Sequence, residues 1–254
     1  MARTIVITRA AFGIGKATAA IAEARGWQPI RVDLNGGDVE ADLGTPQGRS
    51  AFVEGVTALV GERLDALIAC AGVALPTPLT LQVNYFGAIA TLVGMRPLLA
   101  KGTSPRAVGI SSFASIMQPD SELVEALLAG DEAVALKVAE SKSPAIYYAS
   151  SKAALARWMR RQAITTNWAG AGILLNGIAP GIIETPMTQP MLADKERRAQ
   201  LEQQLPMPIG RHGRPEEVAE LLLWLASPAN SLVLGQVIFI DGGSEATVRG
   251  DTVW

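Results

Sequence analysis

The sequence predicts an α/β protein with a Rossmann-type, doubly wound parallel sheet in a single domain. Short apolar and β-branched runs, of which residues 4–8 are the first, alternate along the chain with longer stretches of helical spacing. Both faces of these runs are apolar, as expected for strands covered by helices on either side. The 254 residues contain no internal repeat and no linker-like tract, so one domain over residues 1–254 is expected.

Local signals place the individual elements. Strands are expected at residues 4–8, 30–33, 39–43, 64–70, 106–112, 173–179 and 236–240. Helices are expected at about residues 14–25, 79–100, 148–168 and 215–226. Another helix is expected to begin at Pro46, because proline favours the first helical position and Thr45 can cap it. This alternation brings the carboxyl ends of the strands to one edge of the sheet, where ligands bind.

Composition excludes several classes of partner. A net charge of −2, with only 18% charged residues, gives no electrostatic reason to expect nucleic acid or an anionic membrane. The chain has one cysteine, Cys70, which suits a reducing compartment. Its N-terminus lacks a secretory apolar region, and no apolar run is long enough to span a bilayer. We therefore expect a cytoplasmic protein with no nucleic-acid or membrane partner.

Glycines and carboxylates at the predicted edge point to a dinucleotide. Gly13 and Gly15 can let the backbone approach a pyrophosphate at the start of the next helix, although an ordinary turn also uses such glycines. Asp33 ends the second predicted strand, where it can accept hydrogen bonds from ribose hydroxyls and repel a 2′-phosphate. These features favour NAD. Asp42 could bind the adenine amino group or cap a surface turn.

The segment Cys70-Ala71-Gly72 ends the next predicted strand at the same edge. Gly72 would let the backbone pass close to the cofactor, or could serve a turn. Cys70 is expected to be a small core residue, because no neighbouring His or Cys suggests metal or thiol chemistry.

A phenol and an ammonium form the candidate catalytic pair. Tyr148 and Lys152 are four residues apart and so share a helix face, where the cation is expected to lower the tyrosine pKa. Such spacing is common on solvated helices, but Ser111-Ser112 follows a buried strand at the same edge and can hold a substrate oxygen. Asn84 could bind a water that links Lys152 to solvent, or could bond the backbone.

In this order the motifs resemble the short-chain dehydrogenase/reductase family along nearly the whole chain. The resemblance is carried by the glycine turn, Asp33, Cys70-Ala71-Gly72, Val83-Asn84-Tyr85-Phe86-Gly87, Ile110-Ser111-Ser112, Tyr148 with Lys152, Asn176 to Gly181, Thr185, Gly210 to Ala219 and Ile240-Asp241-Gly242-Gly243. It implies a catalytic tetrad of Asn84, Ser112, Tyr148 and Lys152. The NAD contacts it implies are Gly13, Ile14, Gly15, Asp33, Asp42, Leu43, Cys70, Ala71, Gly72, Tyr148, Lys152, Pro180, Gly181, Ile183 and Thr185. The lone His212 lies in a non-catalytic loop motif of the family and is not expected to be a base.

Arg9 departs from the family pattern because it stands at the position of the family's first glycine. An arginine lacks the backbone freedom of glycine. Its side chain is expected to leave past the adenosine pocket and either to pair with Asp33, weakening the NAD preference, or to lie on the surface. On this basis Arg9→Gly is expected to tighten NAD(H) binding.

A helical insertion at about residues 114–146 is the second departure, since 35 residues separate Ser112 from Tyr148. Within it, residues 121–128 have a helical pattern that Ser121 can cap. Bacterial hydroxysteroid dehydrogenases of the family have a similar insertion and pair their subunits by another surface than the catalytic helix. The resemblance therefore implies a homodimer that is not built on residues 148–168.

Residues 182–208 are expected to form a lid over the substrate. Their apolar, flexible side chains are Met187, Pro190, Met191, Leu192, Leu201, Leu205 and Met207, while Lys195, Arg197 and Arg198 are expected on a solvated face. A small hydrophobic alcohol or ketone fits such a lid, with a hydroxysteroid, a monoterpenol or another cyclic secondary alcohol as candidates. Two alternatives are a dehalogenase of the same fold, which Lys152 and Asp33 argue against, and a non-catalytic NAD-binding regulator.

Overall fold

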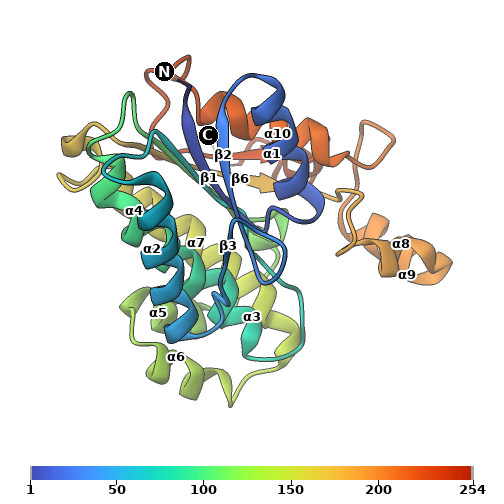
Figure 1. The fold of residues 1–254 in the computed structure, drawn as a ribbon. Helices are drawn as coiled ribbons and strands as arrows, with labels where there is room; N and C mark the ends of the chain where they lie inside the picture. The colour runs from blue at the N-terminus through green and yellow to red at the C-terminus, as the bar shows by residue number, and fades with distance from the viewer. Residues whose placement is uncertain (1, 253–254) are drawn as a thin grey trace.

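The computed structural model describes residues 2–252, in which seven parallel strands form one sheet (Figure 1). The strands are β1 (Thr4–Thr8), β2 (Gln28–Asp33), β3 (Val39–Glu40), β4 (Ala66–Ala69), β5 (Arg106–Ile110), β6 (Leu174–Pro180) and β7 (Val237–Ile240). Their order is β3-β2-β1-β4-β5-β6-β7, and every neighbouring pair is parallel. The chain reverses its winding direction between β1 and β4, which opens a crevice at their carboxyl ends. The predicted doubly wound fold is confirmed.

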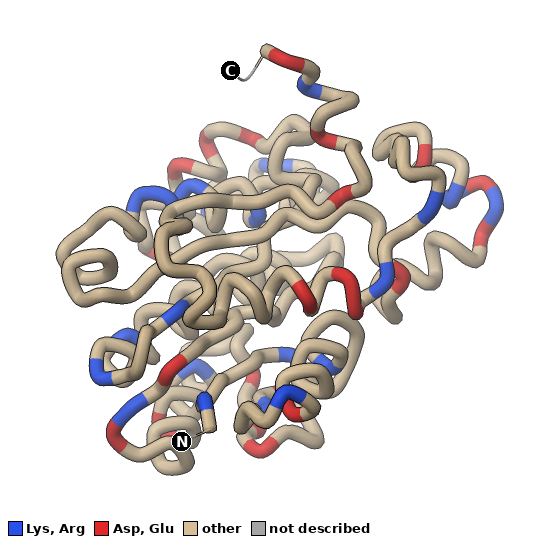
Figure 2. The backbone as a smooth tube through the Cα atoms, turned by 90° about the horizontal axis from the view of Figure 1, so that it is seen from above, with Lys and Arg blue, Asp and Glu red and all other residues tan. Residues whose placement is uncertain are grey.

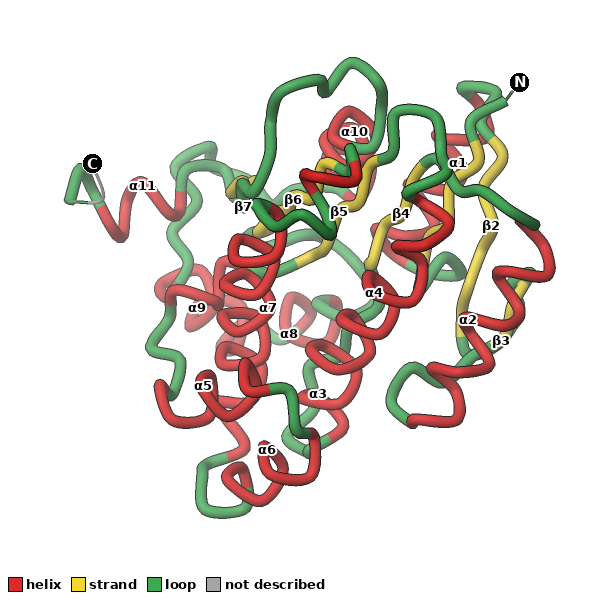
Figure 3. The backbone as a smooth tube through the Cα atoms, turned by 90° about the vertical axis from the view of Figure 1, so that its left-hand side faces the viewer, coloured by secondary structure: helices red, strands yellow, loops and turns green. Residues whose placement is uncertain are grey.

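Helices cover both faces of the sheet (Figures 1 and 3). On one face lie α1 (Gly13–Ala24) and α10 (Pro215–Leu225); on the other lie α2 (Pro46–Val60), α4 (Ala88–Leu99) and α7 (Tyr147–Ala163). Alternate residues of β1 enter the two cores: Ile5 and Ile7 pack toward α1 and α10, whereas Val6 packs toward the other layer. Both faces of the strands are therefore buried, as their apolar sequences predict.

Shorter elements connect these layers. They are α3 (Leu79–Leu81), a π-helical segment η1 (Gln82–Gly87), the 3-10 turns η2 (Phe113–Ile116), η3 (Pro144–Ile146) and η4 (Ala169–Ala171), and the helices α5 (Ser121–Ala129), α6 (Glu132–Ala139), α8 (Gln189–Ala193), α9 (Lys195–Gln204) and α11 (Ser244–Arg249). The predicted continuous helix over residues 79–100 is thus interrupted by the π-helical segment.

Several element ends differ from the prediction for local reasons. Thr45 caps α2 as expected, accepting a hydrogen bond from Gly48 N at 3.0 Å. The third strand stops at Glu40 rather than residue 43, because Asp42 Oδ1 accepts a hydrogen bond from Gly44 N and forms a turn. Helix α7 ends at Ala163 rather than at residue 168. Just after this end, the Thr165 hydroxyl donates a hydrogen bond to the carbonyl of Gln162.

The segment between β5 and α7 packs as a pair of short helices below the sheet (Figure 3). Helix α5 lies against α7, where Arg157 Nη1 and Glu125 Oε1 are 3.2 Å apart. Asp120 caps α5, accepting from Leu123 N at 2.8 Å, so the predicted cap at Ser121 is wrong by one residue. The insertion therefore covers part of the outer surface of α7.

Two further features concern the molecular surface. Helices α8 and α9 project from the main body (Figure 1), and residues of both charge signs are interspersed along the chain (Figure 2). Among residues 2–252 there is no helix with the length and hydrophobicity that crossing a bilayer requires.

Candidate active site

Two adjoining cavities form a groove at the carboxyl edge of the sheet. The first, which we call the Tyr148 cavity, has an open volume of about 730 Å³. The second, which we call the Asp33 cavity, has an open volume of about 1080 Å³. Both are lined by Arg9, Phe12 and Gly72, so the two form one continuous groove.

The groove collects all the site residues predicted from the sequence except one. The Tyr148 cavity is lined by Gly13, Ile14, Gly15, Cys70, Gly72, Ser112, Tyr148, Lys152, Pro180, Gly181, Ile183 and Thr185. The Asp33 cavity is lined by Asp33, Asp42, Leu43, Ala71 and Gly72. Asn84 lines neither cavity.

The turn after β1 needs its two glycines for different reasons. Gly13 has a positive φ of 51°, which a side chain would strain. A Cβ on Gly15 would lie 2.1 Å from the carbonyl oxygen of Arg9, so only glycine fits there. The backbone can therefore fold tightly at the N-terminus of α1, whose first residues, Gly13 to Gly15, line the Tyr148 cavity.

Thr8 holds the turn after β4, a role that the sequence did not reveal. Its Oγ1 accepts hydrogen bonds from the amides of Cys70 and Ala71, both at 2.9 Å. Burial raises the pKa of the Cys70 thiol to about 11, which keeps it protonated and inert. Cys70 is thus a small core residue at the groove, as predicted.

Asp33 faces the second cavity from the end of β2. Its Oδ2 accepts a hydrogen bond from Ala11 N and its Oδ1 accepts one from Leu34 N, both at 2.8 Å. Among residues 2–252 no ion pair joins Arg9 to Asp33, and Arg9 lines both cavities instead of leaving past the adenosine pocket. The expected direction of the Arg9 side chain is therefore wrong.

Tyr148 and Lys152 share one face of α7 at the floor of the first cavity. The Lys152 ammonium lies 5.9 Å from the centroid of the tyrosine ring and donates a hydrogen bond to the Ile110 carbonyl at 2.7 Å. Burial lowers the pKa of Lys152 to about 8. Burial also raises the pKa of Tyr148, while a hydrogen bond with Ser112 and the charge of Arg9 lower it in part. In the protein alone, the expected lowering of the tyrosine pKa is wrong, because desolvation outweighs the nearby charges.

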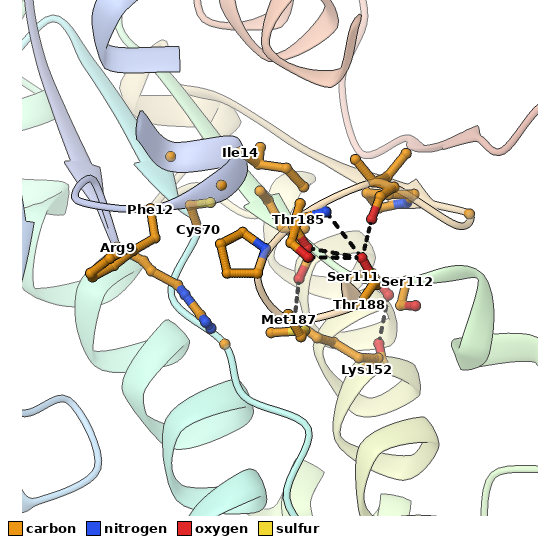
Figure 4. A pocket seen from close by; sticks show the side chains of 18 of the residues that line it. Arg9, Phe12, Ile14, Cys70, Ser111, Ser112, Lys152, Thr185, Met187 and Thr188 are labelled. Atoms are coloured by element: carbon orange, nitrogen blue, oxygen red, sulfur yellow. Dashed lines mark hydrogen bonds between the residues drawn. The ribbon is translucent and has the colours of Figure 1, made fainter. Parts of the chain in front are cut away.

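The two adjacent serines after β5 have different environments (Figure 4). Ser111 is buried, and its hydroxyl donates a hydrogen bond to the Lys152 carbonyl at 2.8 Å. Ser112 Oγ accepts from Ala114 N at 3.2 Å and lies beside the Tyr148 phenol. Ser112 is therefore the serine placed to share a ligand oxygen with the tyrosine.

Asn84 lies in the π-helical segment and is fully buried. Its Oδ1 accepts from Val73 N at 2.8 Å, and its Nδ2 donates to Val73 O at 2.9 Å and to Ser151 Oγ at 3.2 Å. A Cβ on Gly72 would lie 3.2 Å from Asn84 Oδ1 and 3.3 Å from Lys152 Nζ. The amide thus holds the turn after β4 beside Lys152, which is the backbone-bonding alternative considered from the sequence.

The segment at residues 182–208 contributes Ile183 and residues 185–188 to the first cavity. Of its predicted apolar lid residues, Met187 reaches that cavity. Lys195, Arg197 and Arg198 are exposed, as the solvated-face interpretation predicts. His212 lines neither cavity of the groove and contacts Glu202 Oε1 through Nε2 at 2.9 Å.

The residues present fit a nicotinamide dinucleotide. The cavities lie side by side at the point where the strand order reverses, which is where dinucleotides bind in this class of sheet. A Cβ on Gly13 would come within 3.4 Å of the Thr185 side chain and would fill the space between the glycine turn and the 182–188 segment. Fold and groove define an oxidoreductase that uses a nicotinamide cofactor.

Comparison with known proteins agrees with this class. A family model described as Enoyl-(Acyl carrier protein) reductase matches residues 133–245. The 3-alpha-hydroxysteroid dehydrogenase/carbonyl reductase of Comamonas testosteroni is 40% identical over 253 residues, which cover 96% of this chain and 97% of the relative. The chain therefore belongs to the short-chain dehydrogenase/reductase family, as its motifs predict.

Two solved structures are similar over almost their whole length. The 3-alpha-hydroxysteroid dehydrogenase from Pseudomonas sp. B-0831, complexed with NADH, has a TM-score of 0.91 and 40% identity, with 98% of this chain and 99% of that chain covered. A protein from Beutenbergia cavernae with bound NADP has a TM-score of 0.75 and 29% identity, with 96% and 97% covered. Structural neighbours of this chain thus include proteins with either nicotinamide cofactor.

Proposed function

We propose that this chain is an NAD(H)-dependent dehydrogenase that interconverts a hydrophobic cyclic secondary alcohol and its ketone. The observation that carries the proposal is the half-buried Tyr148 phenol, which lies beside Ser112 and Lys152 in a cavity continuous with that of Asp33. Three side chains able to bind and deprotonate an alcohol therefore adjoin a carboxylate able to bind a ribose.

In this proposal Tyr148 moves the proton. When bound, NAD supplies the acceptor for the hydride that leaves the alcohol carbon. The ionised Tyr148 oxygen takes the proton of the substrate hydroxyl during oxidation and becomes a phenol, and the phenol returns that proton during reduction. Ser112 Oγ holds the substrate oxygen against the phenol, and the hydrogen bond that it already shares with Tyr148 favours the ionised form.

Lys152 and Asn84 support this proton transfer. Lys152 has a pKa near working pH, about 8, which suits a group that exchanges a proton and binds ribose hydroxyls. Asn84 acts as a positioning residue, because its amide fixes Val73 and so the turn beside Lys152. The remaining contacts proposed from the sequence, from the glycine turn to Thr185, bind the cofactor along the groove.

Asp33 favours NAD over NADP in this proposal. Both carboxylate oxygens accept from backbone amides, which hold the charge at the end of β2 where it faces the second cavity. A 2′-phosphate beside this charge would be repelled. The relative solved with NADH supports this preference, although another neighbour has NADP bound.

A hydroxysteroid is the substrate class that we propose first. The name of the Comamonas testosteroni relative supports it, as does the apolar lining that Ile183, Pro186 and Met187 give the Tyr148 cavity. Monoterpenols and other cyclic secondary alcohols fit the same chemistry. We further propose that residues 182–208 act as the substrate lid, and that the protein is a cytoplasmic homodimer whose interface avoids α7, since α5 already packs there.

A paired assay of cofactor and alcohol tests the proposal. The purified protein is incubated with NAD or NADP and with steroid, monoterpene and aromatic secondary alcohols, and formation of the reduced cofactor is followed by absorbance. We expect turnover of cyclic alcohols, with kcat/KM higher for NAD. Activity restricted to the reduction of other bulky or aromatic ketones would replace the proposed substrate class. Cofactor binding without turnover across alcohols and ketones would favour a non-catalytic regulator.

A further inference from the structure

Arg9 has a backbone conformation that its own side chain disfavours. Its φ is 55°, in the left-handed region where a non-glycine residue is strained. The neighbouring chain does not allow relaxation: Ala10 N donates to Val32 O at 3.2 Å, and the Arg9 carbonyl packs where a Cβ on Gly15 would be. The turn therefore fixes the direction in which the Arg9 side chain leaves the backbone.

That direction is into the groove. Arg9 is one of the three residues that line both cavities, and Figure 4 shows its side chain running from the turn into the cavity. Within residues 2–252 the guanidinium has no hydrogen bond or ion pair to the protein, and Figure 4 draws none. The cation therefore lies at the junction of the two cavities with no partner among the described residues.

The centre of the groove is electropositive. The charge of Arg9 lowers the pKa of Lys152 and of Tyr148, so the guanidinium lies close enough to act on both. One carboxylate of the groove, Asp33, already accepts hydrogen bonds from two backbone amides. An anion placed between Arg9 and Lys152 would relieve the repulsion between these two cations.

We propose that Arg9 is a cofactor-binding residue whose guanidinium pairs with the diphosphate of the dinucleotide at the junction of the two cavities. The inference rests on the proposed function, because it requires a dinucleotide in the groove. The diphosphate of a dinucleotide joins its two nucleosides. If each nucleoside occupies one cavity, the diphosphate lies at their junction, which Arg9 lines. A guanidinium matches phosphate oxygens with paired donors, and this contact offsets the strained backbone.

The proposal reverses the expectation drawn from the sequence for Arg9→Gly. That expectation assumed a side chain outside the pocket, for which glycine would only remove strain. With the side chain in the groove, Arg9→Gly removes strain and also removes a diphosphate contact. The two variants Arg9→Asn and Arg9→Gly separate these effects, because asparagine tolerates the left-handed conformation and removes the charge, whereas glycine removes the strain as well.

Equilibrium binding without substrate provides the test. Dissociation constants for NADH, ADP, 2′,5′-ADP and adenosine are measured by calorimetry or by fluorescence quenching for the wild type and Arg9→Asn. We expect ADP and NADH to bind about 10- to 100-fold more weakly to the variant, adenosine to bind equally, and the salt dependence of ADP binding to decrease. Arg9→Gly is expected to weaken ADP binding similarly while raising the melting temperature.

Arg25→Asn is the matched control. Arg25 carries the same charge but lies at the C-terminal end of α1, where it pairs with Glu220, so its loss should leave ADP binding unchanged. Unchanged or tighter ADP binding in both Arg9 variants would overturn the proposal. A loss confined to 2′,5′-ADP would also overturn it, by assigning the guanidinium to a 2′-phosphate. Arg9-dependent ADP binding in a protein that oxidises no alcohol would instead contradict the proposed function alone.

Discussion

The ammonium of Lys152 lies 5.9 Å from the centroid of the Tyr148 ring, and its hydrogen bond goes to the carbonyl of Ile110 rather than to the phenol. The cation is thus held below the tyrosine by the end of β5, one residue before the paired serines. The Lys152 ammonium is buried, and desolvation of its charge lowers the stability of the folded protein. Such a cost is typical of a group retained for function rather than for folding.

The cost should appear as a pH dependence of stability. Burial lowers the pKa of Lys152 from 10.5 to about 8, so between these values the unfolded chain binds more protons than the folded one. Relative to Lys152→Met, the free energy of unfolding of the wild type should therefore rise with pH across this window. The total increase should be about 3 kcal/mol. Below the window the difference between the two proteins should be constant.

Urea unfolding of both proteins at a series of pH values measures this difference. Lys152→Met is the comparison because it keeps a long side chain and cannot titrate. Parallel stability curves across the window would mean that the Lys152 pKa is not lowered in the folded protein.

Tyr148 and Tyr147 are adjacent tyrosines that should respond differently to loss of the hydroxyl. Tyr148→Phe removes the proposed proton-transfer group and should lower kcat by about 10²- to 10⁴-fold while NADH still binds. Tyr147 Oη donates to the Ala139 carbonyl at 2.8 Å, inside the insertion. Tyr147→Phe should therefore cost about 1 kcal/mol of stability and leave kcat within a few-fold. Steady-state kinetics and thermal unfolding of both variants check the pair; similar kcat values would refute the assignment.

The two serines after β5 provide a second matched pair. Ser112→Ala removes the hydroxyl that shares a hydrogen bond with Tyr148, and kcat should fall by about 10²-fold or more. Ser111→Ala removes a buried donor to the Lys152 carbonyl, which should mainly lower the melting temperature. Single-turnover kinetics separates the effect on chemistry from that on binding. A larger decrease of kcat in Ser111→Ala than in Ser112→Ala would assign the catalytic hydroxyl to Ser111.

Asp33 should control the choice between the two nicotinamide cofactors. Asp33→Asn removes the charge that faces the second cavity, and the ratio of kcat/KM for NADP to that for NAD should rise at least about 10-fold. Asp38→Asn is the control, since this exposed carboxylate accepts a hydrogen bond from Arg31 N outside the cavity. Cofactor kinetics with one alcohol measures both variants. An equal change in both would attribute the effect to net charge.

The sequence predicted the sheet and most of the groove because those features depend on local patterns. Apolar β-branched runs become buried strands. Because the strands are parallel, their carboxyl ends bring Asp33 and Ser112 to the same edge of the sheet, whatever the path of the loops between them. The motif order then identified the family. The sheet and the family are therefore as predicted, whereas the ends of several helices and strands differ.

Two predictions that depended on side-chain direction or desolvation failed, those for Arg9 and for the Tyr148 pKa. The direction of Arg9 follows from a left-handed φ and from contacts of its neighbours, none of which is visible in a spacing. The Tyr148 pKa is raised because burial outweighs nearby charges, a balance that requires the packed environment. Thr8 was missed because its hydrogen bonds join two strands distant in sequence.

Transfer of deuterium from the alcohol to the cofactor is the direct measure of the proposed hydride transfer. A cyclic secondary alcohol deuterated at its carbinol carbon is incubated with the protein and NAD, and the reduced cofactor is examined by mass spectrometry and NMR. We expect one deuterium in the nicotinamide ring of the NADH formed by the wild type, and loss of this product in Tyr148→Phe. Bound NAD that stays oxidised, or reduced cofactor that contains no deuterium, would contradict it.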